Sequence, residues 1–414
     1  MLCATSVSYS SILSGTQFGS LTPERGLRQG DPLSPYLFLF CTESFSSLLQ
    51  HAESVGNIRG VSICHQAPTI SHLLFADDTL IFCQASHESS SNIRNILNTY
   101  RRASGQEINF QKSSITFSRN TEPTLRASLA SEFGIHTDNK MEMYLGLPSI
   151  AARSKKTLFA NIRDRVWQRI SGWHEKLLSQ AGREVLLQSI IQAIPTYAMS
   201  CFKLPDSLLK EIQSLMARFW WSSNGSNKIH WISWQKLCDS KLFGGIGFRR
   251  LHLFNLAMLC KQLWRILKSP DCLISRVLRP RYFPSGNVLE ANLGHRPSFT
   301  WRSIFSAMDI FKAGCRWRVG SGSTIKVWND PWLPRPACFK PITPLILHLA
   351  SLKVSDLILQ DTIDWNSELV SSLLWPEDRD VILGIPLSKA GCNDTLVWCI
   401  TLLTGCSQFE ALTI

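Results

Sequence analysis

Residues 71–83, SHLLFADDTLIFC, place two short apolar runs on either side of an Ala-Asp-Asp turn. Such runs bounded by turn residues predict β-strands, here over residues 73–75 and 79–83. A turn this short joins antiparallel neighbours, so it constrains this part of the chain to a hairpin in an antiparallel sheet. Asp77 and Asp78 lie at its tip. A solvated turn and a carboxylate pair that binds a divalent metal are both open interpretations.

Helical patterns lie on both sides of this hairpin. Residues 34–50 begin with Ser34, a capping residue type, and Pro35, which suits the first helical turn. Apolar residues then recur at helical spacing, and they do so again over residues 91–105, which end on a glycine stop. Residues 113–118 alternate in the manner of a strand. Helices mixed with antiparallel strands predict an α+β fold.

The net charge of the chain is +12, and it is unevenly distributed. Residues 151–290 hold 22 Lys and Arg against 8 Asp and Glu, whereas the remainder holds 21 against 23. The same block has amphipathic helical periodicity over residues 155–220 and 250–281. A basic helical surface suits a polyanion such as nucleic acid or an anionic membrane surface, and an ordinary solvated face is the alternative.

Composition narrows the class of protein further. The 414 residues are 44% hydrophobic and 18% charged, which is typical of a globular chain with two or three domains. The 13 cysteines are scattered without a CxxC pair, which predicts reduced thiols rather than a disulfide framework or zinc finger. Without a signal-peptide pattern or an apolar run of about 18 residues, we expect an intracellular protein, nuclear or cytoplasmic, with no membrane partner.

A second motif lies upstream of the hairpin. Residues 25–38, RGLRQGDPLSPYLF, form a Gly-rich turn that leads into the predicted helix. Free N–H groups at a helix start suit anions, and Arg25 and Arg28 add positive charge. Taken alone, this stretch is better explained as a loop that caps a helix.

Together the two motifs resemble the reverse transcriptases of plant LINE-type (non-LTR) retrotransposons. RQGDPLSPYLF precedes FADDTLIF, with Gln29 and Asp77 48 residues apart. Further segments resemble the family in the same order, and the resemblance covers nearly the whole chain. These segments are SGQEINFQKSS (104–114), YLGLP (144–148), the stretch 172–205, the stretch 244–267 and RWRVGSGSTIKVWNDPWLP (316–334).

The resemblance implies an RNA-directed DNA polymerase. Such an enzyme performs two-metal nucleotidyl transfer with Mg²⁺ as cofactor, deoxynucleotides as substrates, and an RNA template and DNA primer as partners. It implies a partial palm, an antiparallel sheet with helices, in residues 1–150. A basic helical thumb-like and connecting region follows in 151–285. A mixed, Trp-rich C-terminal region in 286–414 precedes the place of a zinc-binding and ribonuclease H segment, which we expect to be missing.

Individual residues match the family's functional positions. Asp77 and Asp78 match the catalytic, metal-binding carboxylates, and Lys112 matches a lysine that assists the leaving pyrophosphate. The positions that match nucleotide, template and primer contacts are Arg28, Gln29, Gly30, Phe75, Tyr144, Leu145 and Gly146. The positions expected to meet nucleic-acid phosphates are Lys155, Lys156, Arg163, Arg165 and Arg169. Four tryptophans could stack on bases, but their density favours a place in the core: Trp220, Trp221, Trp231 and Trp234.

One part of the family pattern has no counterpart in the sequence. The family carries another metal-binding aspartate on a strand upstream of the segment that residues 6–19 match, and the sequence begins at Met1. We therefore expect this chain alone to extend a primer poorly. The alternative is a catalytically dead, nucleic-acid-binding remnant of such an element. A maturase-like splicing factor is a third possibility, which the segment 316–334 disfavours.

Overall fold

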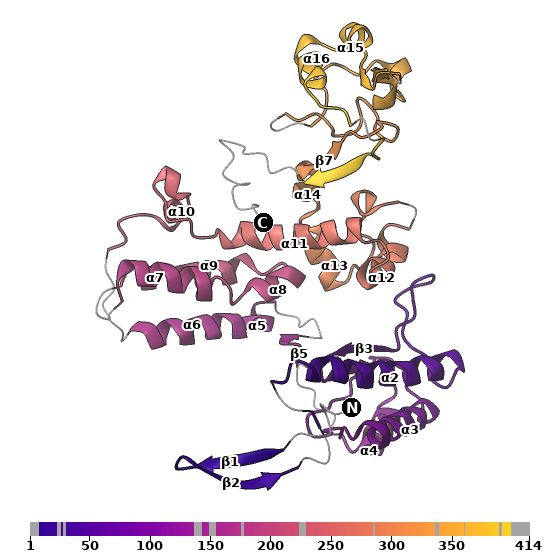
Figure 1. The fold of residues 1–414 in the computed structure, drawn as a ribbon, viewed down its shortest axis with the longest axis vertical. Coiled ribbons are helices and arrows are strands. Elements are labelled where there is room, and N and C mark those ends of the chain that lie inside the picture. The colour runs from indigo at the N-terminus through magenta and orange to yellow at the C-terminus, as the bar shows by residue number, and fades with distance from the viewer. Residues whose placement is uncertain are drawn as a thin grey trace. The chain divides into compact units, whose positions relative to one another are not determined.

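The computed structural model shows two compact units, Met1–Ile150 and Ala151–Ile414, which are described separately below (Figure 1). The residues that the structure describes are 8–22, 26–27, 30–135, 143–148, 155–174, 178–222, 229–284, 286–335, 339–359, 361–388 and 391–398.

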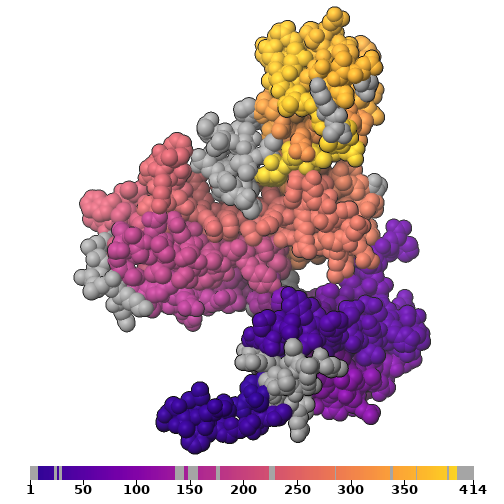
Figure 2. Space-filling model, viewed as in Figure 1, coloured from indigo at the N-terminus to yellow at the C-terminus, as the bar shows by residue number. Residues whose placement is uncertain are grey.

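The first unit combines helices with antiparallel hairpins, so the expectation of an α+β fold is confirmed for the chain. Its elements are β1 (Tyr9–Leu13), β2 (Thr16–Leu21), α2 (Ser34–Ser54), β3 (His72–Phe75), β4 (Asp78–Ile81), α3 (His87–Ser104), α4 (Pro123–Phe133), β5 (Met143–Tyr144) and β6 (Leu147–Pro148). All residues of β1 and β2 are exposed, and Figure 2 shows this hairpin projecting from the body of the unit.

The core of the first unit lies between α2 and α3. It consists of Phe45, Leu49, Ala52, Ile58, Ile93 and Tyr100. The rings of Phe45 and Tyr100 stack with their centroids 4.6 Å apart, which joins the two helices. The end of α3 is as predicted, since Gly105 caps it with a left-handed φ of 71°.

Two local predictions for this unit are wrong. Ser34 is the first helical residue rather than the cap, and Asp31 provides the turn instead, with its carboxylate accepting the Leu33 N–H at 2.8 Å. Residues 113–118 form no strand. Alternation makes a strand possible, but a strand also needs a hydrogen-bonded partner, and the described residues offer none here.

The second unit begins with helices, as predicted for residues 155–281. Its elements are α5 (Lys155–Leu158), α6 (Ala160–His174), α7 (Gln180–Leu186), α8 (Thr196–Cys201), α9 (Asp206–Trp221), α10 (Trp234–Leu237), α11 (Leu251–Lys268), α12 (Leu273–Tyr282), α13 (Phe299–Phe305), α14 (Met308–Gly314), β7 (Cys315–Arg318), β8 (Ile358–Leu359), β9 (Asp364–Trp365), α15 (Ser367–Leu373), α16 (Pro376–Leu383) and β10 (Thr395–Trp398). A π-helical turn at Leu187–Ile191 continues α7.

Helix α11 organises the centre of this unit, where it contacts α8, α9, α13 and α14. Asn255 on α11 is buried, and its side chain satisfies three backbone groups. Its Oδ1 accepts the Leu204 N–H at 2.8 Å, and its Nδ2 donates to the carbonyls of Met199 and Phe202. A buried amide with these partners fixes the end of α8 against α11.

Tyr282 and Phe283 lie just before position 285, where the sequence predicted a boundary between two regions. Tyr282 and Phe283 are 4% and 7% exposed, and both belong to a core that continues through Trp301. Tyr282 stacks on Trp301 with a centroid distance of 4.6 Å. Because one core includes residues on both sides of position 285, the packing gives no support to a boundary there.

A third core occupies the C-terminal part of the second unit, around Val319, Ile325, Trp332 and Ile382. Strand β7 pairs with β10 in antiparallel register, Cys315 opposite Trp398. The Gly/Ser turn after β7 lies so close to the start of β10 that a Cβ at Gly320 would collide with the backbone there. Within the described part of the chain, no helix is long and apolar enough to cross a membrane.

Candidate functional site

The two aspartates lie on the predicted hairpin. Strands β3 and β4 pair with Phe75 opposite Asp78, so Ala76 and Asp77 form a two-residue turn. Ala76 has a positive φ of 48° and Asp77 does not, which is the φ pattern of a type II′ turn. This turn matches the right-handed twist of the strands, which explains why so short a connection forms here.

Helix α2 holds the hairpin on one face only. Side chains alternate along a strand, so His72, Leu74 and Ile81 point to one face, whereas Phe75 and Asp78 point to the other. Leu74 and Ile81 pack against the α2–α3 core. The acidic tip therefore projects from a strand pair whose opposite face is partly buried against the α2–α3 core.

A polar contact also fastens the hairpin to α2. His72 Nε2 and the Ser46 hydroxyl form a hydrogen bond of 2.9 Å, and His72 Nδ1 lies 3.0 Å from the Ser71 hydroxyl. Burial lowers the pKa of His72, and the charges of Glu53 and Glu43 only partly offset this shift. The neutral imidazole is thus favoured in the folded hairpin.

Asp77, Asp78 and Phe75 are exposed, and Phe75 retains 60% of its accessible surface. Exposed carboxylates are open to an ion and to a charged ligand in a way that buried ones are not. Within the described residues, no group of three or more His, Cys, Asp or Glu side chains is arranged to hold a metal ion. The described hairpin thus offers a pair of oxygen ligands without a third side chain.

A second hairpin lies within electrostatic reach of the first. Strands β5 and β6 flank a turn in which Leu145 and Gly146 have positive φ values of 49° and 76°, the pattern of a type I′ turn. Burial raises the pKa of the Tyr144 phenol, and the charge of Asp78 raises it further. The fold thereby brings together two positions that are 66 residues apart in the sequence.

The other residues matched to nucleotide contacts have different environments. Gly30 is exposed with a φ of 86°, a conformation that favours glycine. Arg28 and Gln29 lie outside the described residues. Lys112 is exposed, and its backbone N–H donates to both the carbonyl and the side chain of Asn109, which fixes the turn that carries it.

Helix α6 carries three of the five residues expected to meet phosphates. Ile162, Val166 and Ile170 are buried along one side, as the amphipathic pattern predicts. On the other side, Arg165 and Arg169 are exposed, whereas Arg163 forms an ion pair with Asp164 at 2.7 Å. The side chains of Lys155 and Lys156 lie outside the described residues.

The tryptophans divide between core and surface. Trp220 is buried, and Trp234 stacks on Phe248 with centroids 4.9 Å apart, so the core interpretation holds for both. Trp231 is 76% exposed. Trp167 on α6 is 52% exposed although it lies next to buried Val166. Successive helical residues point about 100° apart, so a residue directly after buried Val166 points away from the buried side. This spacing could have indicated from the sequence that Trp167 is exposed.

Comparison of the sequence with known proteins shows the class of protein to which this chain is similar. The family model for reverse transcriptase (RNA-dependent DNA polymerase) matches residues 2–149, which include both hairpins. An uncharacterized mitochondrial protein of Arabidopsis thaliana is 48% identical over 143 residues, 34% of this chain and 93% of that protein. A candidate ribonuclease H protein of the same plant is 35% identical over 192 residues, 45% of this chain and 31% of that protein.

A transposon protein from an animal is also similar. The uncharacterized 149 kDa protein of transposon TX1 from Xenopus laevis is 25% identical over 255 residues, 58% of this chain and 18% of that protein. This chain thus spans less than a third of each of the two longer relatives. It belongs to the reverse transcriptase family of plant retrotransposons.

Proposed function

We propose that this chain contributes the carboxylate hairpin of an RNA-directed DNA polymerase that acts on a primer–template. In this proposal residues 1–150 are part of the palm, residues 151–285 are a thumb-like nucleic-acid-binding region, and residues 286–414 are a C-terminal region. The observation that supports it best is the pair Asp77 and Asp78, exposed at the tip of a hairpin whose other face packs, partly buried, against the α2–α3 core.

The residues of the tip fit one Mg²⁺ ion. Magnesium prefers hard oxygen ligands, and in polymerase sites it uses one or two carboxylates together with waters and substrate phosphates. When bound, the ion would stabilise the charge that develops on the transferred phosphoryl group. A second ion needs further carboxylates, and the described residues bring no third acidic or histidine ligand to the pair.

The chain's own residues position the reactants. The rigid attachment of β3 to α2 holds the two carboxylates in place, which is the condition for productive geometry at a reacting centre. Tyr144 and the turn beside it face the primer end in this proposal, and Lys112 carries positive charge toward the leaving pyrophosphate. Arg165 and Arg169 bind backbone phosphates, with affinity that falls as the salt concentration rises.

The second candidate function is nucleic-acid binding without catalysis. The charge surplus of residues 151–290 favours it, because that surplus is independent of the hairpin. The two candidates differ in one testable respect. A polymerase site requires a metal ion on Asp77 and Asp78, whereas a binding remnant does not.

The test is calorimetric titration of the full chain with Mn²⁺, an oxygen-binding probe ion, combined with primer extension on an RNA template. We expect weak binding of one ion that the double variant Asp77→Asn, Asp78→Asn abolishes, and extension close to background. Glu122→Gln is the matched control, because Glu122 is exposed in the same unit and its side chain does not cap α4. Ion binding that is equal in both variants would refute the proposed site and leave the binding function.

A further inference from the structure

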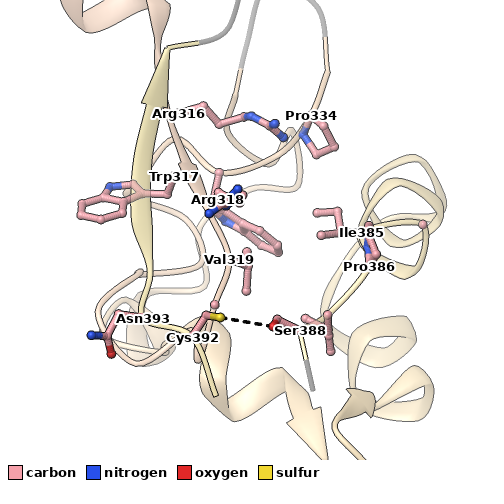
Figure 3. Close-up of a pocket in the computed structure, with 14 residues that line it drawn as sticks. Arg316, Trp317, Arg318, Val319, Pro334, Ile385, Pro386, Ser388, Cys392 and Asn393 are labelled. Carbon is pink, nitrogen blue, oxygen red and sulfur yellow. Dashed lines mark hydrogen bonds between the residues drawn. The ribbon is translucent and has the colours of Figure 1, made fainter. Parts of the chain in front are cut away.

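The C-terminal part of the second unit contains a pocket of about 570 Å³ (Figure 3). Its walls come from stretches that are far apart in the sequence: residues 316–320, Trp332 with Pro334, residues 384–388, and residues 392–393. The volume falls in the range of sites that bind small molecules or single residues of a polymer.

The floor of the pocket is apolar and fixed. Val319 is 7% exposed and Trp332 is fully buried in the C-terminal core. The Trp332 indole N–H donates to the Val327 carbonyl at 2.8 Å, which holds the ring in place. Ile385 and Pro386 form the opposite wall in Figure 3. Such walls suit a flat, apolar group that enters from solvent.

The remaining wall is cationic. Arg316 and Arg318 are two residues apart on β7, so their side chains share one face of the strand. Figure 3 shows both on the pocket side, whereas Trp317 points away. No Asp or Glu is among the lining residues, and Arg318 has no ion pair with any described carboxylate.

The carboxylate next to the lining residue Asn393, that of Asp394, forms hydrogen bonds with the Gly/Ser turn. Asp394 Oδ1 accepts the N–H groups of Gly320 and Gly322, both at 2.8 Å. Its Oδ2 accepts the N–H and the hydroxyl of Thr324 at 3.0 and 2.8 Å. The pocket thus combines positive charge on one side with apolar surface on the others.

We propose that this pocket binds one unpaired nucleotide of a single-stranded nucleic acid, with the base between the apolar walls and its phosphate on the two arginines. Guanidinium groups bind phosphate oxygens in pairs of parallel hydrogen bonds. A base inside a duplex cannot enter a pocket without leaving the stack, so a single strand is the fitting ligand. This site does not depend on the polymerase proposal, since none of its residues belongs to the hairpins.

A thiol at the pocket gives a local readout. Cys392 lines the pocket and is the exposed cysteine among those described, and Ser388 donates a hydrogen bond to its sulfur at 3.4 Å. A bound oligouridylate should slow alkylation of Cys392 by iodoacetamide in the full chain. Alkylation of Cys272, which is outside the pocket, should not change. Mass spectrometry of the two peptides measures both rates in one sample.

Three variants separate binding in the pocket from general electrostatic attraction. Arg318→Gln should weaken oligouridylate binding, measured by fluorescence anisotropy, and lower the salt slope by about 0.7, as loss of one single-strand phosphate contact requires. Arg302→Gln, which removes an exposed charge on α13, should leave the protection of Cys392 intact. Ser388→Phe, which narrows the pocket and keeps its arginines, should abolish that protection. Tryptophan fluorescence checks that each variant is folded.

The competing ligands distinguish a strand from a free nucleotide. We expect uridine monophosphate to protect Cys392 much more weakly than the oligouridylate, and a duplex of equal length not to protect it. Equal protection by the monophosphate would overturn the assignment to a strand. Unchanged alkylation of Cys392 with saturating oligouridylate, or equal effects of Arg318→Gln and Arg302→Gln, would overturn the site itself.

Discussion

The carboxylate of Asp394 joins the start of β10 to the Gly/Ser turn after β7, and its replacement by asparagine gives a quantitative test of the C-terminal fold. Burial would raise the pKa of Asp394, but hydrogen bonds from Thr324, Gly320 and Gly322 outweigh it and lower the pKa below its usual value. Asparagine keeps one oxygen for two of these groups. It turns an NH₂ group toward the donors of Thr324, so two bonds and the charge are lost.

The size of the effect follows from these contacts. Hydrogen bonds to a charged group contribute about 1.5–3 kcal/mol each, which sets an upper limit of about 6 kcal/mol for the two lost bonds. Thr324 is exposed, so water replaces part of this interaction. We therefore expect Asp394→Asn to lower the free energy of unfolding by about 3 kcal/mol. Asp364→Asn, at an exposed carboxylate on β9, should change it by about 0.5 kcal/mol or less.

Urea unfolding of the full chain, followed by tryptophan fluorescence, measures this difference. All 14 tryptophans lie beyond residue 150, so the signal reports on the second unit alone. A carboxylate whose pKa is lowered by folding stabilises the fold above its unfolded pKa of about 3.9. That stabilisation disappears as the pH falls through the lower pKa of the folded state. A loss of stability that stayed the same down to the lowest pH at which the chain folds would refute the role of the charge.

Three further predictions concern other contacts. Asn255→Ala should lower the free energy of unfolding by about 2–4 kcal/mol, because three buried backbone groups lose their partner, and the same fluorescence assay measures it. Folding lowers the pKa of His72, so the stability of the hairpin should be highest above about pH 6.5 and should decrease as the pH falls below that value. Hydrogen exchange of the hairpin amides, corrected for intrinsic rates, measures this pH dependence. The variant His72→Gln should not show it. Ala76→Gly should strengthen protection of the hairpin amides by about 1 kcal/mol, since the turn has a positive φ at Ala76.

Local signals in the sequence predicted the hairpin and helix α3 correctly because both depend on neighbours in the chain. The hairpin needs two short apolar runs and a turn, and α3 needs its periodicity and Gly105. Where the sequence analysis was wrong, distant contacts decided the outcome. Residues 113–118 alternate but have no strand partner among the described residues, and Tyr282 and Phe283, beside the predicted boundary at 285, are buried against Trp301 and its neighbours.

The candidate sites show the same division. The place of Asp77 and Asp78 at a hairpin tip was predictable from the sequence, because the two apolar runs and the turn are continuous in the chain, whereas their role as metal ligands is what the family resemblance implies. The electrostatic contact between Asp78 and Tyr144 was not predicted from the sequence, because it joins segments whose distance depends on the fold. The pocket at Arg318 was not predicted either, since Arg318 and Ile385 on its opposite wall are 67 residues apart in the sequence.

The hairpin contains one hydrogen bond and one strained backbone position whose removal should change its stability in opposite directions. The His72–Ser46 hydrogen bond holds the strand pair on α2, so its removal should lower both hairpin stability and the affinity of the tip for a metal ion. The positive φ of Ala76 costs free energy, so glycine should raise hairpin stability. If the strained turn sets the geometry of Asp77 and Asp78, the affinity for the ion should fall in Ala76→Gly although the hairpin becomes more stable. Stability and affinity that rise together would instead show that the strained φ of Ala76 is not needed to position the two carboxylates.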